Sequence, residues 1–415
     1  MRNFRDWVEA CANVTPGKYV PQAFRKWTAL ATVGAALRRQ VWYPHGDWDA
    51  RPNLFIALVA PPTHGKGVSF TAPFDLIYKN LTEPTAGDKK DKEEAQLEWK
   101  KYIRNGDWDT PLRLIGGKVT YEELCVVMKD IIRNVEGTSR GRFPCSSILV
   151  KTSEFGVFMN RTATNLQMLL TEAWDSAPDH EYRTKTAGSF IVKGPTITWC
   201  AAATPSQFVE HMPANAKDQG LLSRIIPVVK MDAPPTMEVR VDSFDMPTIE
   251  KLREDLGQIM EIKGPFWWSK ECEEDLVKPW LEGGLKPLPT DAMMQEYNGR
   301  RFSHLIKMSM CFSAARRDSR VMTSEDWIDA QALLFAAEEN MPLLFRRFSM
   351  SDAGKLADDL VEMVRRTGRM YHKTLQRTAI RTSRTCQDVD AIIATLIESG
   401  ALIKQDDFIL LGTGL

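Results

Sequence analysis

The sequence lacks any stretch of about 18 uncharged apolar residues, so we expect no membrane-spanning segment and no membrane partner. Paired cysteines are missing as well: the seven cysteines are scattered, and none forms a C-x-x-C pair. This spacing argues against a zinc ribbon or a disulfide scaffold. The opening residues, MRNFRDWVEACANV, carry charge too early for a secretory signal. Together these absences indicate a reducing compartment, and we expect a cytoplasmic protein.

Net charge is also absent, because 54 Lys and Arg residues balance 54 Asp and Glu residues. A nucleic-acid partner recruited by bulk charge is therefore excluded, and any such partner must meet a local basic patch. The 415 residues suffice for two or three domains of ~100–200 residues. A hydrophobic content of 43% supplies the material for a sizeable core.

The chain contains several short, continuously apolar runs. Residues 53–60, 146–150, 197–203 and 225–229 each have the pattern of a buried strand. Helical patterns separate them. This alternation predicts an α/β fold, in which helices cover both faces of a parallel sheet.

Shifts in composition divide the chain into four predicted domains. Residues 1–50 form a helical collar, and residues 51–240 form a core with a charged insertion at 82–110. Residues 241–350 form a helical lid. Residues 351–415 follow a separate pattern and form a terminal domain.

A candidate phosphate-binding loop follows the first apolar run. The window from Ala60 to Gly67 approaches the pattern G-x-x-x-x-G-K-[ST], in which backbone N–H groups and a lysine hold phosphates. Gly65 and Lys66 are in place, whereas Ala60 replaces the first glycine. An ordinary strand–helix turn is the alternative. The candidate nucleotide-binding residues are Pro62, Thr63, His64, Gly65, Lys66, Gly67 and Val68.

The ligands for Mg²⁺ are sparse. Gly67 stands where a hydroxyl would bind the metal, so water, Ser69 or Thr63 must substitute. At the end of the second apolar run, Ser153 and Glu154 form a weak candidate metal site, and Glu154 could polarise an attacking water. The alternative is that Glu154 is a helix N-terminal acid with Ser153 as N-cap. The sparse metal ligands therefore leave the rate of hydrolysis open, from active turnover to slow or absent hydrolysis.

Two later segments resemble a known family. Residues 198–205 and the Leu221-Leu222-Ser223-Arg224 segment resemble the sensor strand and arginine-finger segment of AAA+ ring ATPases, especially minichromosome-maintenance-type helicases. Residues 171–188 are similar to the region that carries a pore hairpin in those helicases, and residues 300–307 and 323–326 resemble lid helices. The order also resembles the helicase part of phage primase-helicase proteins. The resemblance spans roughly residues 20–345.

The resemblance implies a P-loop core in a hexameric ring, with ATP and Mg²⁺ at subunit boundaries. Each implied residue also has a plain structural alternative: a surface ion pair, a turn hydroxyl or a solvated helix face. The implied roles are phosphate contact by Lys66, water positioning by Glu154 and Thr204, a finger from Arg224, and a second sensor from Arg300 or Arg301.

Two basic regions are candidate DNA contacts. The first is a predicted hairpin at residues 181–195, whose cations either grip strand phosphates in a pore or solvate a surface ribbon. The second is residues 351–415, where three predicted helices and a hairpin indicate a winged helix. Seven Lys and Arg residues and no acid lie between Met363 and Gln387; protein packing is the alternative use. The candidate DNA-binding residues are Arg183, Lys185, Lys193, Lys373, Arg377, Arg381 and Arg384.

These observations predict an ATP-dependent DNA helicase or translocase of replication, phage-encoded and acting in the bacterial host cytoplasm. Its expected partners are single-stranded or forked DNA and copies of itself. No primase zinc site is present in the sequence, so a primase or initiator would be a separate protein. Two alternatives stay open: a weakly or non-hydrolysing initiator or loader, and a structural or regulatory winged-helix protein with a relic loop.

Overall fold

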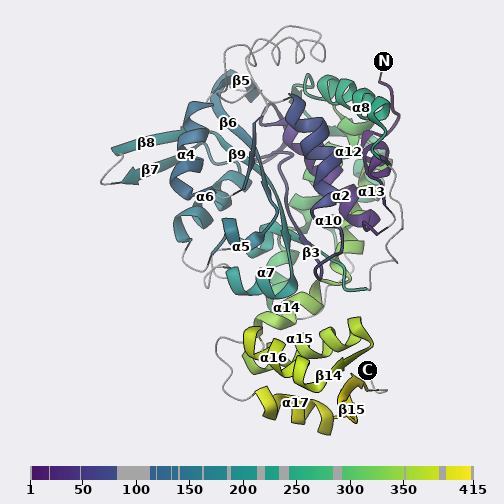
Figure 1. The fold of residues 1–415 in the computed structure, drawn as a ribbon. Coiled ribbons are helices and arrows are strands. Elements are labelled where there is room, and N and C mark those ends of the chain that lie inside the picture. The colour runs from purple at the N-terminus through teal and green to yellow at the C-terminus, as the bar shows by residue number, and fades with distance from the viewer. Residues whose placement is uncertain are drawn as a thin grey trace. The chain divides into compact units, whose positions relative to one another are not determined.

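The chain divides into two units, Met1–Pro342 and Leu343–Leu415, which are described separately (Figure 1). The predicted insertion at 82–110, together with Lys185 and Arg384, lies outside the described residues. The computed structural model describes residues 2–17, 19–46, 48–81, 113–117, 119–131, 133–138, 141–160, 163–184, 188–212, 220–232, 243–283, 292–349, 352–382 and 389–412.

The first unit is built on a sheet whose five parallel strands lie in the order β10-β3-β9-β6-β4. The four apolar runs are confirmed as strands, and β3, β9 and β10 are buried at every position. β4 was not predicted, because it has three residues and none is buried. The bounds are β3 Phe55–Val59, β4 Leu114–Gly116, β6 Gly141–Thr152, β9 Pro195–Ala203 and β10 Ile225–Val229, with β5 Arg133–Thr138 antiparallel to β6.

Helices lie on both sides of this sheet (Figure 1). On one side is α2, Gln22–Leu37, which is apolar almost all round and has 12 of its 16 residues buried, as expected of a core helix. It packs against α12, Arg301–Arg316. On the other side are α4, Tyr121–Asp130, and α6, Thr164–Trp174. The predicted α/β class is therefore confirmed at this level.

The predicted collar, core and lid belong to one unit. α1 and α2 from the collar pack against α8 and α12 from the lid, so their apolar faces share one core. The boundary of the unit falls near the start of α14, whereas the sequence placed it after residue 350. The remaining elements are α1 Trp7–Val14, β1 Val41–His45, β2 Trp48–Ala50, η1 Val68–Phe70, η2 Thr71–Ile77, η3 Tyr78–Leu81, α5 Phe155–Phe158, β7 Asp179–Thr184, β8 Gly188–Lys193, α7 Pro205–His211, η4 Leu222–Arg224, α8 Met246–Ile259, β11 Gly264–Pro265, β12 Trp267–Trp268, α9 Lys270–Cys272, η5 Glu273–Val277, α10 Lys278–Leu281, α11 Ala292–Asn298, β13 Val321–Met322, α13 Ser324–Glu338 and α14 Met341–Ser349.

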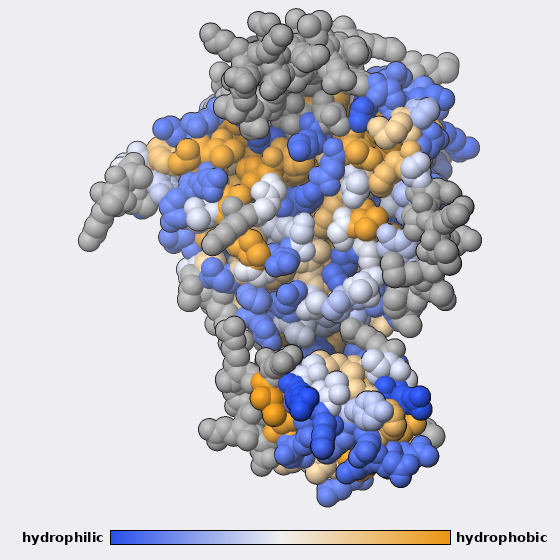
Figure 2. Space-filling view, in the orientation of Figure 1, coloured by the Kyte–Doolittle hydropathy of each residue, from blue (hydrophilic) through white to orange (hydrophobic). Residues whose placement is uncertain are grey.

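The second unit has its own small core, which includes Leu360, Leu375, Ile393 and Ile409. Its three strands pair antiparallel in the order β14-β16-β15. The predicted helices and hairpin are present, whereas β14 was not predicted. Hydrophilic side chains dominate the face of this unit shown in Figure 2, with hydrophobic ones at its margins. The bounds are α15 Asp352–Thr367, β14 Arg369–Tyr371, α16 His372–Thr382, α17 Val389–Glu398, β15 Leu402–Gln405 and β16 Phe408–Leu411.

Candidate functional site

The loop after β3 lies at the point where the sheet changes its direction of winding. β3 and β9 are neighbours, but the chain leaves β3 for β4 at one edge of the sheet and leaves β9 for β10 at the other. In open parallel sheets, ligands bind in the crevice at the carboxyl ends of two such strands. The N–H of Ala60 donates to the carbonyl of Ala203 at 3.2 Å, which holds the two strand ends together. The fold therefore places the predicted loop where open parallel sheets commonly bind ligands.

The loop has a backbone that requires glycine at one position. Gly65 has φ +67°, and a Cβ there would lie 2.8 Å from a methyl group of Val20. The ammonium of Lys66 turns back and donates to the carbonyls of Ala60 and Pro61, each at 2.6 Å. The loop is thus closed around the Lys66 ammonium.

A buried histidine fixes the far side of this loop. The ring nitrogens of His64 lie 3.1 Å from the carbonyl of Pro62 and 2.7 Å from that of Asp232, just beyond β10. The helix that follows is irregular: η1, η2 and η3 are a 3₁₀, a π and a second 3₁₀ segment. Pro73 lies inside the π segment and has no N–H for the regular helical bond.

The hydroxyls near the loop differ in their availability to a metal ion. Ser69 is fully buried and its hydroxyl donates to the carbonyl of Lys66 at 2.6 Å, whereas Thr63 is exposed. Ser153 and Glu154 are both exposed beyond the end of β6. Within the described part of the chain, no group of three or more His, Cys, Asp or Glu residues could hold a metal. A phosphate-bound Mg²⁺ needs only one or two protein oxygens, so Ser153 and Glu154 fit this minimal requirement.

The Glu154 side chain does not act as a helix cap. Glu154, not Ser153, is the N-cap of α5, and its side chain makes no capping hydrogen bond. Thr204, in contrast, caps α7. The Thr204 hydroxyl oxygen accepts from the backbone N–H of Gln207, and the Gln207 side-chain oxygen accepts from the backbone N–H of Thr204, each at 3.2 Å. Both residues lie at the carboxyl edge with the loop, so the structure brings these three predicted elements to one side of the sheet.

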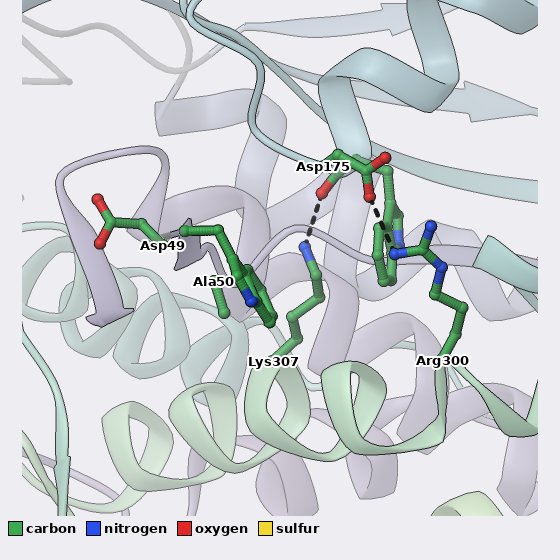
Figure 3. Close-up of a pocket in the computed structure, with 7 residues that line it drawn as sticks. Asp49, Ala50, Asp175, Arg300 and Lys307 are labelled. Atoms are coloured by element: carbon green, nitrogen blue, oxygen red, sulfur yellow. Dashed lines mark hydrogen bonds and ion pairs between the residues drawn. The ribbon is translucent and has the colours of Figure 1, made fainter. Parts of the chain in front are cut away.

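Arg224 and Arg300 meet at the opposite edge, on Asp175, and Figure 3 shows Arg300 paired with it. Arg224 directly precedes β10 and is 5% exposed. It pairs with the Asp175 carboxylate through two nitrogens and donates to the carbonyl of Gly220 at 2.6 Å. Arg300 lies 3.5 Å from the same carboxylate. One acid thus serves two arginines that are far apart in the sequence.

A third cation, Lys307, completes this cluster. Its ammonium donates to the Asn53 side chain at 2.7 Å and to the carbonyl of Trp174 at 3.0 Å, and Figure 3 shows its side chain extending toward the backbone beside Asp175. Burial lowers the pKa of Lys307 to about 7, and Asp175 opposes the shift. Cation–ring distances to Trp174 are 5.7 Å for Arg224, 5.6 Å for Arg300 and 4.2 Å for Lys307. A cavity of about 220 Å³ adjoins the cluster, lined by Trp48, Asp49, Ala50, Trp174, Asp175, Arg300 and Lys307.

Arg301 lies apart from this cluster. Its guanidinium donates to both oxygens of Glu338, at 2.9 and 2.8 Å, and packs on Trp280 and Phe335. Both partners of the ion pair are buried. The structure therefore separates the two neighbouring arginines: Arg300 joins Asp175, and Arg301 is enclosed by the lid helices.

The predicted DNA contacts are only partly described. In the hairpin formed by β7 and β8, Arg183 pairs with Glu181 at 2.5 Å and Lys193 with Asp179 at 2.9 Å. In the second unit, Lys373 and Arg377 are exposed on α16. Arg381 belongs to α16, but its side chain lies outside the described part.

Comparisons with known proteins add no family. No protein-family model matches the chain, and no curated protein is significantly similar to it. Among the described helices, none combines the length and apolar composition that a membrane crossing requires.

Proposed function

We propose that this chain is a nucleotide-binding ATPase that drives a helicase or translocase in DNA replication. The observation that carries the proposal is the closed Gly65-Lys66 loop at the switch point of a parallel sheet. Backbone N–H groups in such a loop suit phosphate oxygens. The Lys66 ammonium already lies inside the loop, and a triphosphate would offer it anionic acceptors that bind more strongly than the carbonyls of Ala60 and Pro61.

The residues beside the loop support a hydrolytic role. Among the described residues, the Glu154 carboxylate makes no hydrogen bond or ion pair, so it can accept a proton from water. The Thr204 hydroxyl oxygen accepts one bond, and its proton is available to orient that water. Mg²⁺, when bound with ATP, would supply positive charge against the phosphates, and Ser153 and Glu154 are the residues that would hold it.

The position of Arg224 supports an oligomer. The loop follows β3 and Arg224 precedes β10, and in a parallel sheet these points lie at opposite edges. An arginine at that edge can complete the nucleotide site of another copy better than its own, provided that it leaves its ion pair with Asp175. We therefore propose a homo-oligomeric ring, hexameric by the resemblance, that encloses single-stranded or forked DNA.

A second candidate function is a nucleotide-binding initiator or loader that hydrolyses ATP weakly or not at all. It is favoured by Gly67 in place of a metal-binding hydroxyl and by the buried hydroxyl of Ser69. DNA-stimulated phosphate release separates the two candidates. We expect wild type to bind ATP and release phosphate with DNA, and Lys66→Ala to lose both. Lys26→Ala, which removes a half-buried lysine paired with Glu9, is the control and should change neither.

The outcomes lead to different conclusions. ATP binding without phosphate release in wild type would support the initiator. A wild-type chain that ignores millimolar ATP would contradict both candidates and leave a relic loop beside a basic terminal unit.

A further inference from the structure

The three-stranded sheet of the second unit has one open face. Its register pairs Tyr371 with Phe408 and Arg369 with Leu410. Because directly opposed residues share a face and successive residues alternate, these four side chains lie together. Ile409 lies on the other face, in the core of the unit. The face that carries Tyr371 is therefore not the one that packs on the core.

This open face presents an exposed tyrosine, a half-buried phenylalanine and a cation. Tyr371 is 57% exposed, and its ring centroid lies 4.2 Å from that of Phe408. The guanidinium carbon of Arg369 lies 5.0 Å from the Phe408 ring. On the adjacent strand Ile403 is 42% exposed. The two rings are tilted by 33°, and an exposed aromatic ring with a neighbouring cation is the usual platform for unpaired bases.

The exposed charges of the unit are unevenly distributed among its helices. α17, the third helix, contains no Lys or Arg, and its charged residues are Asp390 and Glu398. A helix of this composition is a poor partner for the phosphates that line a DNA groove. Two exposed cations lie instead on α16, which begins immediately after Tyr371 and carries Lys373 and Arg377 on one face, and Arg365 and Lys404 are exposed on α15 and β15. Phosphates are therefore drawn to β14 and α16.

We infer that this sheet face binds single-stranded DNA, with bases stacked on Tyr371 and Phe408 and phosphates held by Arg369 and the α16 cations. The inference rests on the proposed function, which needs DNA, and adds where and in which form the second unit binds it. Stacking requires unpaired bases, so the face selects single strands over duplex. The third helix takes no part in the contact.

The test uses the full-length chain with a fluorescent thymidine oligonucleotide and a blunt duplex of equal length. Tyr371→Ala should weaken single-strand binding about tenfold and leave the salt dependence unchanged, because it removes stacking and no charge. Tyr371→Phe keeps the ring and should bind as wild type. Trp267→Ala removes an aromatic side chain of similar exposure, 54%, in the first unit, and should also bind as wild type. Duplex binding should be the same in all of them.

Other results would overturn the inference in distinguishable ways. If Tyr371→Ala binds the oligonucleotide as wild type does while Arg377→Glu weakens binding, the sheet face is not the contact, and the proposed DNA function stands. Equal losses for single strand and duplex would reject selection by stacking. If wild type binds neither DNA, the inference and the proposed DNA function fail together, and an exposed face for a protein partner is left. Far-ultraviolet circular dichroism of each variant verifies folding.

Discussion

Gly65 has a role that no other residue can take at its position. Its φ of +67° lies in the left-handed region, and Val20 occupies the space that a Cβ would need. Gly65→Ala should therefore lower the free energy of unfolding by about 1–3 kcal/mol and weaken nucleotide binding. Urea unfolding and ATP titration measure the two effects.

Gly67 provides the matched control for Gly65. Its φ is −66°, and no atom lies within 4 Å of the position of an added Cβ. Gly67→Ala should leave the unfolding free energy nearly unchanged. Equal losses of stability in both variants would mean that the loop is not held in the conformation described.

Lys307 makes stability depend on pH. Its folded pKa of about 7 is below the unfolded value of about 10.4, so the unfolded chain binds more protons between these two values. The resulting destabilisation is fully present below pH 7 and is relieved as pH rises. The free energy of unfolding of wild type should rise by about 2 kcal/mol between pH 7 and pH 9, relative to that of Lys307→Met. A neutral amine keeps two N–H groups, which match its acceptors on Asn53 and Trp174.

Urea titrations of both proteins at several pH values measure this difference. Other groups titrate alike in the two proteins and cancel. Parallel curves would show that the amine stays protonated in the folded chain.

At the scale of elements, the strands were predictable and their partners were not. β3, β9 and β10 are continuous apolar runs, because a central parallel strand is covered on both faces. β4 and β14 have three residues each, too few for a period to emerge. The sequence could place Gly65, Lys66 and Glu154 after their strands, because the spacing is local.

The cluster at the opposite edge was not predictable in the same way. Asp175 acquires its role only when Arg224 and Arg300 converge on it beside Lys307, and Arg224 precedes the lid whereas Arg300 and Lys307 lie within it. The one local signal was Lys307, a cation in the apolar stretch Leu305-Ile306-Lys307-Met308. A buried lysine needs acceptors, and the sequence does not say which elements bring them.

The hairpin of β7 and β8 lets its DNA role be tested through its acids. Arg183 and Lys193 are both paired with carboxylates. Asp179→Asn combined with Glu181→Gln would release both cations. If the hairpin faces DNA, single-strand affinity should rise and the salt slope should steepen by about 1.4, or 0.7 for each phosphate contact. Fluorescence anisotropy over a salt series measures both quantities.

The reverse substitutions complete that experiment. Arg183→Gln with Lys193→Gln should weaken binding and flatten the slope. If neither double variant changes the slope, the hairpin is a solvated ribbon.

At the scale of the whole molecule, the separation of the loop from Arg224 predicts complementation. Lys66→Ala subunits keep a working arginine, and Arg224→Ala subunits keep a working loop. In an equal mixture, about half of the sites have an intact loop, and about half of those face a neighbour with an intact Arg224. About a quarter of wild-type ATPase activity should therefore return. Each variant alone should be inactive. Phosphate release across mixing ratios is the measurement, and activity that never exceeds that of the separate variants would place both residues outside a shared site.

β9 is the direct connection between two distant parts of the first unit. It begins at Pro195, just after the hairpin, and ends at Ala203, beside Thr204 and the loop. Hydrogen bonds to β3 and β6 hold it on both sides, so it is stiff along its length of about 30 Å. A displacement of the hairpin would therefore be transmitted along β9 to the phosphate loop. If the hairpin binds DNA and the loop binds ATP, as proposed, β9 would carry a load on the hairpin directly to the nucleotide.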